Sequence, residues 1–283
     1  MILVAVYGLL NGLGDIFKKK AVKSDKIAQV LFGYAVVAFV LVAYELGGAI
    51  TLEPKFIALI ALKTAFVFSS WFIALECLKV VPISVFGVIN LSRILFTTLW
   101  GIIFLGESVG INHIIGAIII VGGLLLIDMK NEKKDDFPKE IRLKYTGLII
   151  LSGMLATLSG LLDKILMMNI ESGQLQFWFL LFLVITSAGF MLITRKKEKL
   201  ELKKLAKNYW VMLMALAVVI GERALFIANS SVDSKLSMMA LIKQIGVVST
   251  VLIGGLLFKE KSILYRFACA IIVIIGIGVV VLF

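Results

Sequence analysis

The feature that most constrains this chain is a series of apolar stretches, each about 20 residues long, that recurs from one end to the other. A helix of that length crosses the hydrocarbon core of a bilayer and satisfies its backbone polar groups internally. Barrel strands would instead be roughly ten residues long with alternating polarity. We therefore predict an all-α polytopic membrane protein with ten transmembrane helices: 2–20, 27–50, 55–78, 83–105, 111–129, 145–168, 174–194, 208–231, 235–258 and 262–283.

The composition agrees with a chain that lies almost entirely within or beside a bilayer. Of its 283 residues, 61% are hydrophobic and 17% are charged, whereas soluble domains are roughly 45–50% apolar. The formal net charge of +11 comes from lysines that flank the apolar stretches, where they can contact anionic headgroups. Membrane lipids are therefore expected partners, and nucleic acid is not.

Residues that could hold a metal or carry a catalytic reaction are sparse. Cys77 and Cys269 stand far apart in the sequence, and His113 is the only histidine; a lone imidazole cannot build a metal site. The chain contains no HExxH, GxSxG or phosphate-loop motif. We predict no cofactor, no metal and no enzymatic activity.

Basic residues are distributed unevenly between the predicted spans. The odd-numbered gaps are rich in lysine, as in RKKEKLELKKLAK from Arg195, whereas the even-numbered gaps hold few basic residues, with Lys55 and Lys235 as exceptions. Cytoplasmic loops carry an excess of lysine and arginine, so both termini are predicted to lie outside the plasma membrane. The first stretch has no basic leader and no clear cleavage site, so we expect it to remain as a helix.

A repeat runs through the chain. Residues 81–123 align without gaps on residues 234–276, and the matches include Glu107 with Glu260. The chain then divides into a five-helix repeat, a basic cytoplasmic linker and a second five-helix repeat: 1–130, 131–144 and 145–283. Because five is odd, the second copy enters the membrane from the opposite side, and inverted halves of this kind support alternating access. The repeat therefore predicts transport.

Several segments resemble the EamA-type drug/metabolite transporter superfamily. They are a first helix that ends in GDIFKKKA and, in each half, a span that closes on a glutamate before another apolar span: FLGESVGINHIIGA and LFKEKSILYRFACA. The resemblance covers essentially the whole chain. It implies a metabolite or drug permease whose cavity is lined by the first, third, fourth, sixth, eighth and ninth spans. One departure is Lys235, which stands where the first half has Pro82.

Charged residues interrupt the apolar spans, and each costs roughly 2.5–3.5 kcal/mol at a helix centre unless it faces the bundle interior or water. On the fourth span, Asn90, Arg93 and Thr97 share one helical face, and on the ninth Lys243 and Gly246 take the places of Asn90 and Arg93. A cavity of two-fold shape would then carry different charges on its two sides. The predicted substrate-binding residues are Asn11, Asp15, Lys63, Trp71, Asn90, Arg93, Thr97, Glu222, Arg223, Lys243 and Gln244.

Some roles stay open at this point. Arg93 and Lys243 either contact the solute or form internal ion pairs with Glu222 or Asp15. Glu222 and Arg223 point about 100° apart, so we expect Glu222 to face the cavity and Arg223 to pair laterally with another span. Glu222 either carries a proton through the cycle or is a structural carboxylate neutralised by a neighbouring cation.

Two further sets of residues are predicted to be structural. Glu107 and Glu260 stand in turns and are expected to cap the helix that follows each of them. Small residues of the fifth and tenth spans are expected to allow close helix packing within one chain: Gly116, Gly122, Gly123, Gly276 and Gly278.

The leading prediction is a secondary transporter of a small polar or amphipathic organic metabolite, anionic or zwitterionic. Four interior cations, Lys63, Arg93, Arg223 and Lys243, stand against one firm interior acid, Glu222, which favours an anionic group on the solute. The alternative is an exporter of lipophilic cations, for which Glu222 and Trp71 would serve, or a flippase of a lipid-linked head group. The predicted partner is a small-molecule solute, and the chain is expected to be a monomer or a homodimer.

Overall fold

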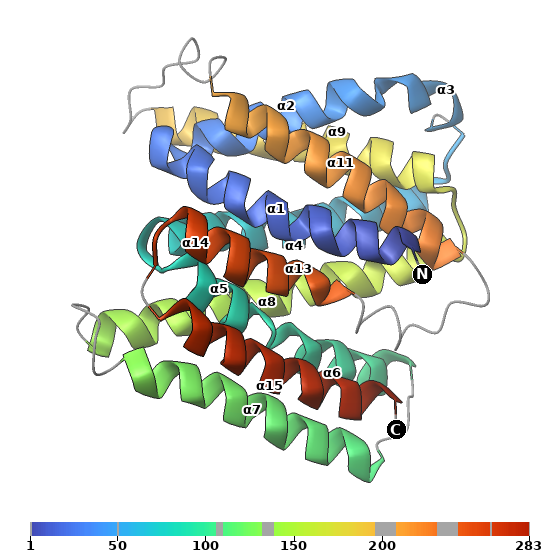
Figure 1. Ribbon diagram of the computed structural model, residues 1–283. Helices are drawn as coiled ribbons and strands as arrows, with labels where there is room; N and C mark the ends of the chain where they lie inside the picture. Colours follow the sequence, from blue (N-terminus) through green and yellow to red (C-terminus); the bar gives the residue numbers. More distant parts are fainter. Residues whose placement is uncertain are drawn as a thin grey trace.

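The computed structural model describes residues 2–49, 51–105, 110–131, 139–195, 208–230, 243–260 and 262–282. These residues form an all-helical bundle, which confirms the prediction that the fold is all-α (Figure 1). Its elements are α1 (Ile2–Ser24), α2 (Ile27–Val42), η1 (Ala43–Glu45), α3 (Leu46–Ala49), α4 (Pro54–Val80), α5 (Ile83–Asn90), α6 (Arg93–Leu105), α7 (Ile111–Asn131), α8 (Lys139–Met167), α9 (Ser172–Arg195), α11 (Tyr209–Ser230), α13 (Ile245–Ser249), η2 (Thr250–Gly254), α14 (Gly255–Leu257) and α15 (Ile263–Leu282).

Helices occupy the described part of every predicted span. Six of them are long and apolar enough to cross a membrane: Ile27–Ala49, Pro54–Val80, Ile83–Phe104, Leu143–Met167, Ser172–Thr194 and Tyr209–Ala228. Three shorter apolar helices accompany them: Ile114–Leu126, Ile245–Leu257 and Ile263–Val279. Helix α1 is in neither group, since its second half carries Asp15 and four lysines. The number of ten membrane crossings stays a prediction.

Two of the predicted spans are irregular near their middle, which the sequence pattern did not indicate. Between α5 and α6, the amides of Leu91 and Ser92 donate to carbonyls three residues back, at 3.1 and 3.0 Å. The ninth span passes from α13 into the π-helix η2, and its first part lies outside the described residues. Short 3₁₀ and π segments within helices are typical of hinges and functional sites.

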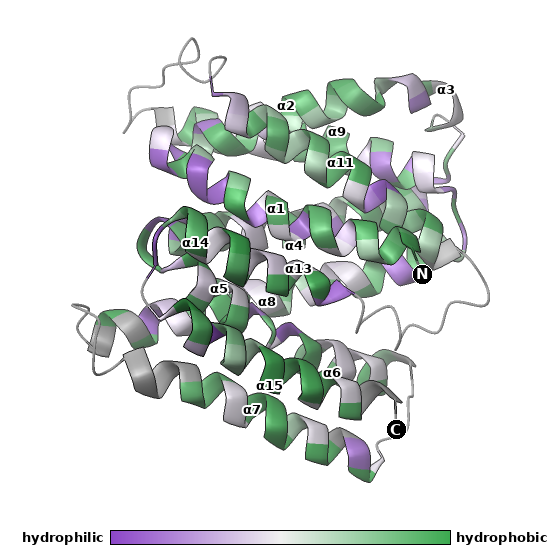
Figure 2. Ribbon diagram, in the orientation of Figure 1, coloured by the Kyte–Doolittle hydropathy of each residue, from purple (hydrophilic) through white to green (hydrophobic). Residues whose placement is uncertain are grey.

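The helices pack in a way that leaves charged residues between two apolar cores. Helices α7 and α15 pair at one edge of the bundle, α2, α9 and α11 form the opposite edge, and α1, α4, α8 and α13 lie between them (Figure 1). One core includes Tyr34 and Phe179, and the other includes Phe86 and Val273. Figure 2 shows hydrophilic residues interrupting the hydrophobic ribbons of the central helices.

The edge pair α7 and α15 tests the prediction about glycines. A Cβ atom at Gly123 or Gly276 would lie 2.6 Å from Val273 or 2.9 Å from Ile120, so these two glycines do permit close packing within the chain. The prediction is wrong for Gly122 and Gly278, because nothing lies within 4 Å of a Cβ placed there.

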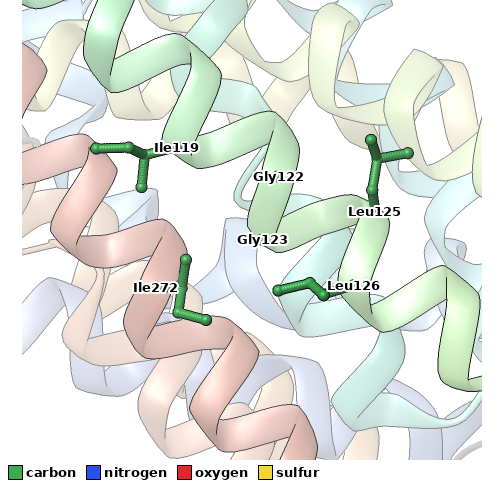
Figure 3. A pocket seen from close by; sticks show the side chains of 6 residues that line it. All are labelled: Ile119, Gly122, Gly123, Leu125, Leu126 and Ile272. Carbon is green, nitrogen blue, oxygen red and sulfur yellow. The ribbon is translucent and has the colours of Figure 1, made fainter.

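A shallow hollow lies between α7 and α15, and the side chains around it are apolar (Figure 3). They belong to Ile119, Gly122, Gly123, Leu125, Leu126 and Ile272. Nearby residues such as Ile118 and Ile275 are 67% and 57% exposed, as expected of a surface that lipid covers. The hollow offers no group that could recognise a polar solute.

Candidate functional site

Charged side chains from five helical segments gather around Tyr7 of α1. The charges of Asp15, Arg93, Asp163 and Glu222 all act on the Tyr7 hydroxyl. The ammonium of Lys243 lies 5.7 Å from the centre of the Tyr7 ring. With the lysine that pairs with Asp163, these residues are called the polar centre: Tyr7, Asp15, Lys63, Arg93, Asp163, Glu222 and Lys243.

Two acids of the polar centre are neutralised by neighbouring lysines. Lys63 Nζ lies 2.9 Å from Asp163 Oδ1, and the Lys63 side chain is only 1% exposed. The same ammonium lies 3.9 Å from the centre of the Phe179 ring, which adds a cation–π contact. Asp15 pairs with Lys18, one turn away on α1, at 2.9 Å. Lys63 and Asp15 are therefore engaged with the protein itself.

Arg93, Glu222 and Lys243 differ from these pairs. Within the part of the chain that the structure describes, none of the three makes an ion pair with another residue. Their charges nevertheless act on one another, because Arg93 and Glu222 both influence Lys243. The internal pairing of Arg93 or Lys243 with Glu222 or Asp15, which was one of the two open alternatives, is absent from these described residues. The polar centre thus holds two cations and one anion that are half-buried and form no direct ion pair among the described residues.

Glycines place these charges against α1 and α8. A Cβ atom at Gly153 of α8 would lie 2.8 Å from Cγ of Arg93, so the missing side chain gives the arginine its room. On the other side, a Cβ at Gly12 would collide with the Gly246 carbonyl, and the backbones of α1 and α13 cross in contact. Thr250 reinforces this crossing by donating to the Gly12 carbonyl at 3.3 Å.

The remaining predicted site residues differ in burial and in the contacts that they make. Asn11, Trp71 and Asn90 are half-buried on α1, α4 and α5, and Gln244 precedes α13. The Lys18 ammonium lies 5.4 Å from the Trp71 ring centre. Thr97 is exposed, and its hydroxyl donates to the Arg93 carbonyl at 3.0 Å. The turn between α5 and α6 separates Asn90 from Arg93, so the three residues of the predicted face differ in environment.

Arg223 belongs to a separate network at one end of the bundle. Its Nε donates to Gln176 of α9 at 2.6 Å, and its Nη2 lies 2.7 Å from Glu45 of η1. Gln176 in turn donates to the Val219 carbonyl at 2.9 Å. Arg223 thus pairs laterally with other helices, as predicted for the neighbour of Glu222, and it is not part of the polar centre.

Glu260 forms the heart of a third network, at the start of α5. Its carboxylate accepts the Ile83 amide at 2.6 Å and the Ser84 amide at 3.1 Å, and it also accepts the Ser84 hydroxyl. Lys19 of α1 and Arg266 of α15 each lie 3.3 Å from the same carboxylate. We call Lys19, Ser84, Glu260 and Arg266 the Glu260 network.

The Glu260 network corrects one expectation. Glu260 was predicted to cap the helix that follows it, yet it caps α5, which belongs to the other half of the chain. Lys259 has a φ of 52° and Ser262 a φ of 58°; both values lie in the left-handed region that non-glycine residues seldom adopt. From this turn the carboxylate bonds the first amides of α5 and meets its own next helix, α15, at Arg266. Glu107 lies outside the described residues.

Two residues of this region were missed from the sequence. Asp163 stands beside Lys164 close to the end of an apolar stretch, where a charged pair is easily taken for an interfacial anchor. Tyr34 is fully buried in an aromatic core, and its hydroxyl has no hydrogen-bond partner among the described residues. The signal for Asp163 in the sequence is an acid one helical turn beyond Gly160, inside the predicted span 145–168.

Fold and composition define an integral, multi-pass helical membrane protein. Across the described ranges, no cluster of three or more potential metal ligands is present. The model of the EamA-like transporter family matches residues 1–129, which is the first of the two predicted repeats. That family consists of transporters, which agrees with the expectation that the chain is not an enzyme.

The comparisons that cover the whole chain give information about the fold only. No curated protein matches. One solved structure, described only as the crystal structure of a protein, has a TM-score of 0.64 at 14% identity. The match covers 99% of this chain and 96% of that one, so the helical arrangement extends over both halves.

Proposed function

We propose that the chain is a secondary transporter that moves a small anionic or zwitterionic organic metabolite by alternating access through the polar centre. The observation that carries the proposal is the group of unpaired interior charges around Tyr7: Arg93, Glu222 and Lys243. Interior charges are costly in a membrane protein and typically mark a solute or ion pathway. The match of residues 1–129 to a transporter family supports the same reading.

Helix packing supports a two-fold relation between the halves. If each span of the first half is exchanged with its counterpart in the second, the pair α1–α11 becomes α8–α4, and both pairs are in contact. The pair α1–α13 becomes α8–α6, and α2–α11 becomes α9–α4, again with contact in each case. Halves related in this way can exchange conformations, which opens the centre to one side and then to the other.

The Arg223 network and the Glu260 network are candidates for the contacts that close the two ends of the bundle in such a cycle. The start of α5 and α14 lie at one end of the bundle, and α3 lies at the other (Figure 1). The Glu260 network joins both halves at the first end, which we propose faces the cytoplasm because the second half of α1 brings Lys18, Lys19, Lys20 and Lys23 towards it. The Arg223 network joins α9, α11 and η1 at the second end. Each network would break when its end opens.

The test is flux in proteoliposomes containing the full chain and loaded with buffer. The probes are radiolabelled alanine, leucine, succinate, glucose 6-phosphate and tetraphenylphosphonium, each offered with and without a pH gradient. We expect saturable uptake of at least one zwitterionic or anionic probe and none of tetraphenylphosphonium. Lys243→Met should abolish that uptake, whereas Lys55→Met should not, because Lys55 forms an exposed pair with Glu53.

Two results would contradict the proposal. Uptake of tetraphenylphosphonium without any zwitterion or anion would favour a lipophilic-cation exporter. Equal uptake of the zwitterionic and anionic probes by wild type and Lys243→Met would remove the polar centre from the pathway.

A further inference from the structure

Three lysines near the end of α1 surround one aromatic ring. The ammonium groups of Lys19, Lys20 and Lys23 lie 5.1, 5.1 and 4.9 Å from the centre of the Phe258 ring. Lys20 Nζ also lies 5.6 Å from the centre of the Trp210 ring. These five residues, which we call the basic-aromatic cluster, join the end of α1 to the start of α11 and to the residue that follows α14.

Two of the three ammonium groups have no acid beside them. Lys19 lies 3.3 Å from Glu260 and donates to the Val81 carbonyl at 2.9 Å. Neither Lys20 nor Lys23 pairs with an acid within the part of the chain that the structure describes. The face of an aromatic ring attracts a cation, but the ring carries no net charge. Two positive charges of the cluster are therefore left without a counter-charge from these residues.

The spacing of the lysines brings them within reach of a single anion. Lys20 and Lys23 are three residues apart and Lys19 and Lys23 are four apart, so Lys23 shares a helical face with both. Since all three ammonium groups lie close to one ring centre, any two are no more than about 10 Å apart, within the range at which charges interact in dilute salt. An anion between Lys20 and Lys23 would offset their repulsion and accept a hydrogen bond from each.

The surroundings of the cluster are those of a membrane surface. Tyr209 stacks beside Trp210 with the ring centres 4.5 Å apart, and tyrosine and tryptophan are enriched at the level of the lipid head groups. Leu256 and Leu257, which stand immediately before Phe258, are exposed. A molecule with an anionic head and an apolar tail would find a matching group for each part.

We infer that the basic-aromatic cluster binds the phosphate of an anionic phospholipid from the leaflet at that end of the bundle. The phosphate oxygens accept hydrogen bonds from Lys20 and Lys23, and the acyl chains lie against exposed apolar side chains such as Leu256 and Leu257. Basic pockets between transmembrane helices are typical sites for anionic head groups. A soluble phosphate compound shares the head-group chemistry but has no part that would contact the leucines.

Binding of single lipids to the full chain in detergent, measured by native mass spectrometry, tests the inference. The probes are phosphatidylglycerol and phosphatidylcholine with identical acyl chains, which differ in net charge. We expect the first phosphatidylglycerol to bind at least about 10-fold more tightly than the first phosphatidylcholine, because each lysine near an anionic head group contributes roughly five-fold. Equal affinities for the two lipids would overturn the inference.

Variants locate the site. Lys20→Met and Lys23→Met should each lower the affinity ratio of the two lipids by about five-fold, and the double variant Lys20→Arg/Lys23→Arg should keep it, because both charges remain. The matched control is Lys79→Met. Lys79 is exposed, stands two residues before Val81 at the same end of the bundle, and contacts no aromatic ring among the described residues.

The control should change the ratio by less than about two-fold, since a charge outside the cluster is screened by salt. An equal fall in Lys20→Met, Lys23→Met and Lys79→Met would show a diffuse attraction to basic residues and would overturn the site. Because both lipids are compared on the same protein, a general loss of folding does not imitate the expected change in the ratio.

Inorganic phosphate and glycerol 3-phosphate, offered at millimolar concentration, separate a lipid from a soluble phosphate compound. Neither should displace phosphatidylglycerol, because neither has an acyl chain. Complete displacement by either would overturn the assignment to a lipid. None of these measurements requires flux, so their failure would leave the transport proposal standing, and an absence of flux would leave the lipid site standing.

Discussion

At the scale of single residues, the buried charges are of two kinds. Lys63 and Asp163 neutralise each other within the protein, whereas Arg93, Glu222 and Lys243 act on one another without direct ion pairs among the described residues. The first kind holds helices together, and we propose that the second offers groups to a solute. Residue type alone does not separate them, since each kind contains a lysine and an acid.

Lys63→Met is predicted to destabilise the protein strongly. It would leave Asp163 buried without its cation, and losing one partner of a buried pair costs about 3–5 kcal/mol. Thermal unfolding of the purified protein in detergent measures the effect. The double variant Lys63→Met/Asp163→Leu should recover most of the stability, because it removes both charges together.

The exposed pair of Glu53 and Lys55 provides the matched control. Lys55→Met should change stability by no more than about 1 kcal/mol, as for other surface ion pairs. Equal effects of Lys63→Met and Lys55→Met would show that the buried pair has no special role.

The sequence was informative about which residues are interior and less so about their partners. Helical spacing and apolar context predicted Lys63, Arg93, Glu222 and Lys243 as interior charges. Whether an interior cation is paired within the protein depends on whether a neighbouring helix places an acid beside it. Asp163 of α8 does so for Lys63. That information comes from packing between segments about 100 residues apart.

At the scale of elements, α1 is the helix on which the site depends. It contacts α11 along one side and α13 on another, and its backbone meets α13 where Gly12 faces Gly246. Two glycines on α1 differ sharply, since a Cβ at Gly12 would collide with backbone and one at Gly14 would meet nothing within 4 Å.

Gly12→Ala is therefore predicted to destabilise the protein by about 1–3 kcal/mol, since α1 and α13 must separate to admit a methyl group. Gly14→Ala should be neutral or stabilising by about 0.5–1 kcal/mol, because alanine favours the helix. Thermal unfolding of both variants gives the comparison. Equal effects at the two positions would mean that α1 and α13 do not cross in contact.

Glu260→Gln is predicted to weaken the end of the bundle where α5 begins. Glutamine keeps the size of the side chain but removes the negative charge that Lys19 and Arg266 contact, at a cost of about 3–5 kcal/mol. The melting temperature measures the loss, with Glu53→Gln as the exposed control. An unchanged melting temperature would contradict the role assigned to the Glu260 network.

The positions of the helices were predicted well from the sequence, whereas the turns between them and the contacts at their ends were not. Apolar length located the helices, but it did not locate the turn between Asn90 and Arg93, because Leu91 and Ser92 include no glycine or proline that would mark a break. The cap on α5 comes from Glu260, 177 residues beyond Ile83. Local rules for capping consider only the next helix and could not have found it.

At the scale of the whole molecule, the two halves that are predicted to be repeats carry different charges at their centre. The contacting helix pairs match under exchange of the halves, while the charges do not, since Arg93 aligns with Gly246 and Lys243 with Asn90. We propose that halves related in this way permit two opposite openings, and that the unequal charges favour one orientation of the solute. The predicted location of both termini outside the cell rests on the distribution of basic residues between the spans.

The central claim is that the polar centre is reached by water from either side of the membrane in turn. Asn11 lies one helical turn from Tyr7 on α1 and is half-buried. The only native cysteines, Cys77 and Cys269, can be replaced by serine. In this background, Asn11→Cys in oriented proteoliposomes would be treated with an impermeant maleimide from one side or from the other. We predict labelling from both sides, slowed by a probe that binds. Labelling from one side only, or from neither, in protein that still transports would contradict the account.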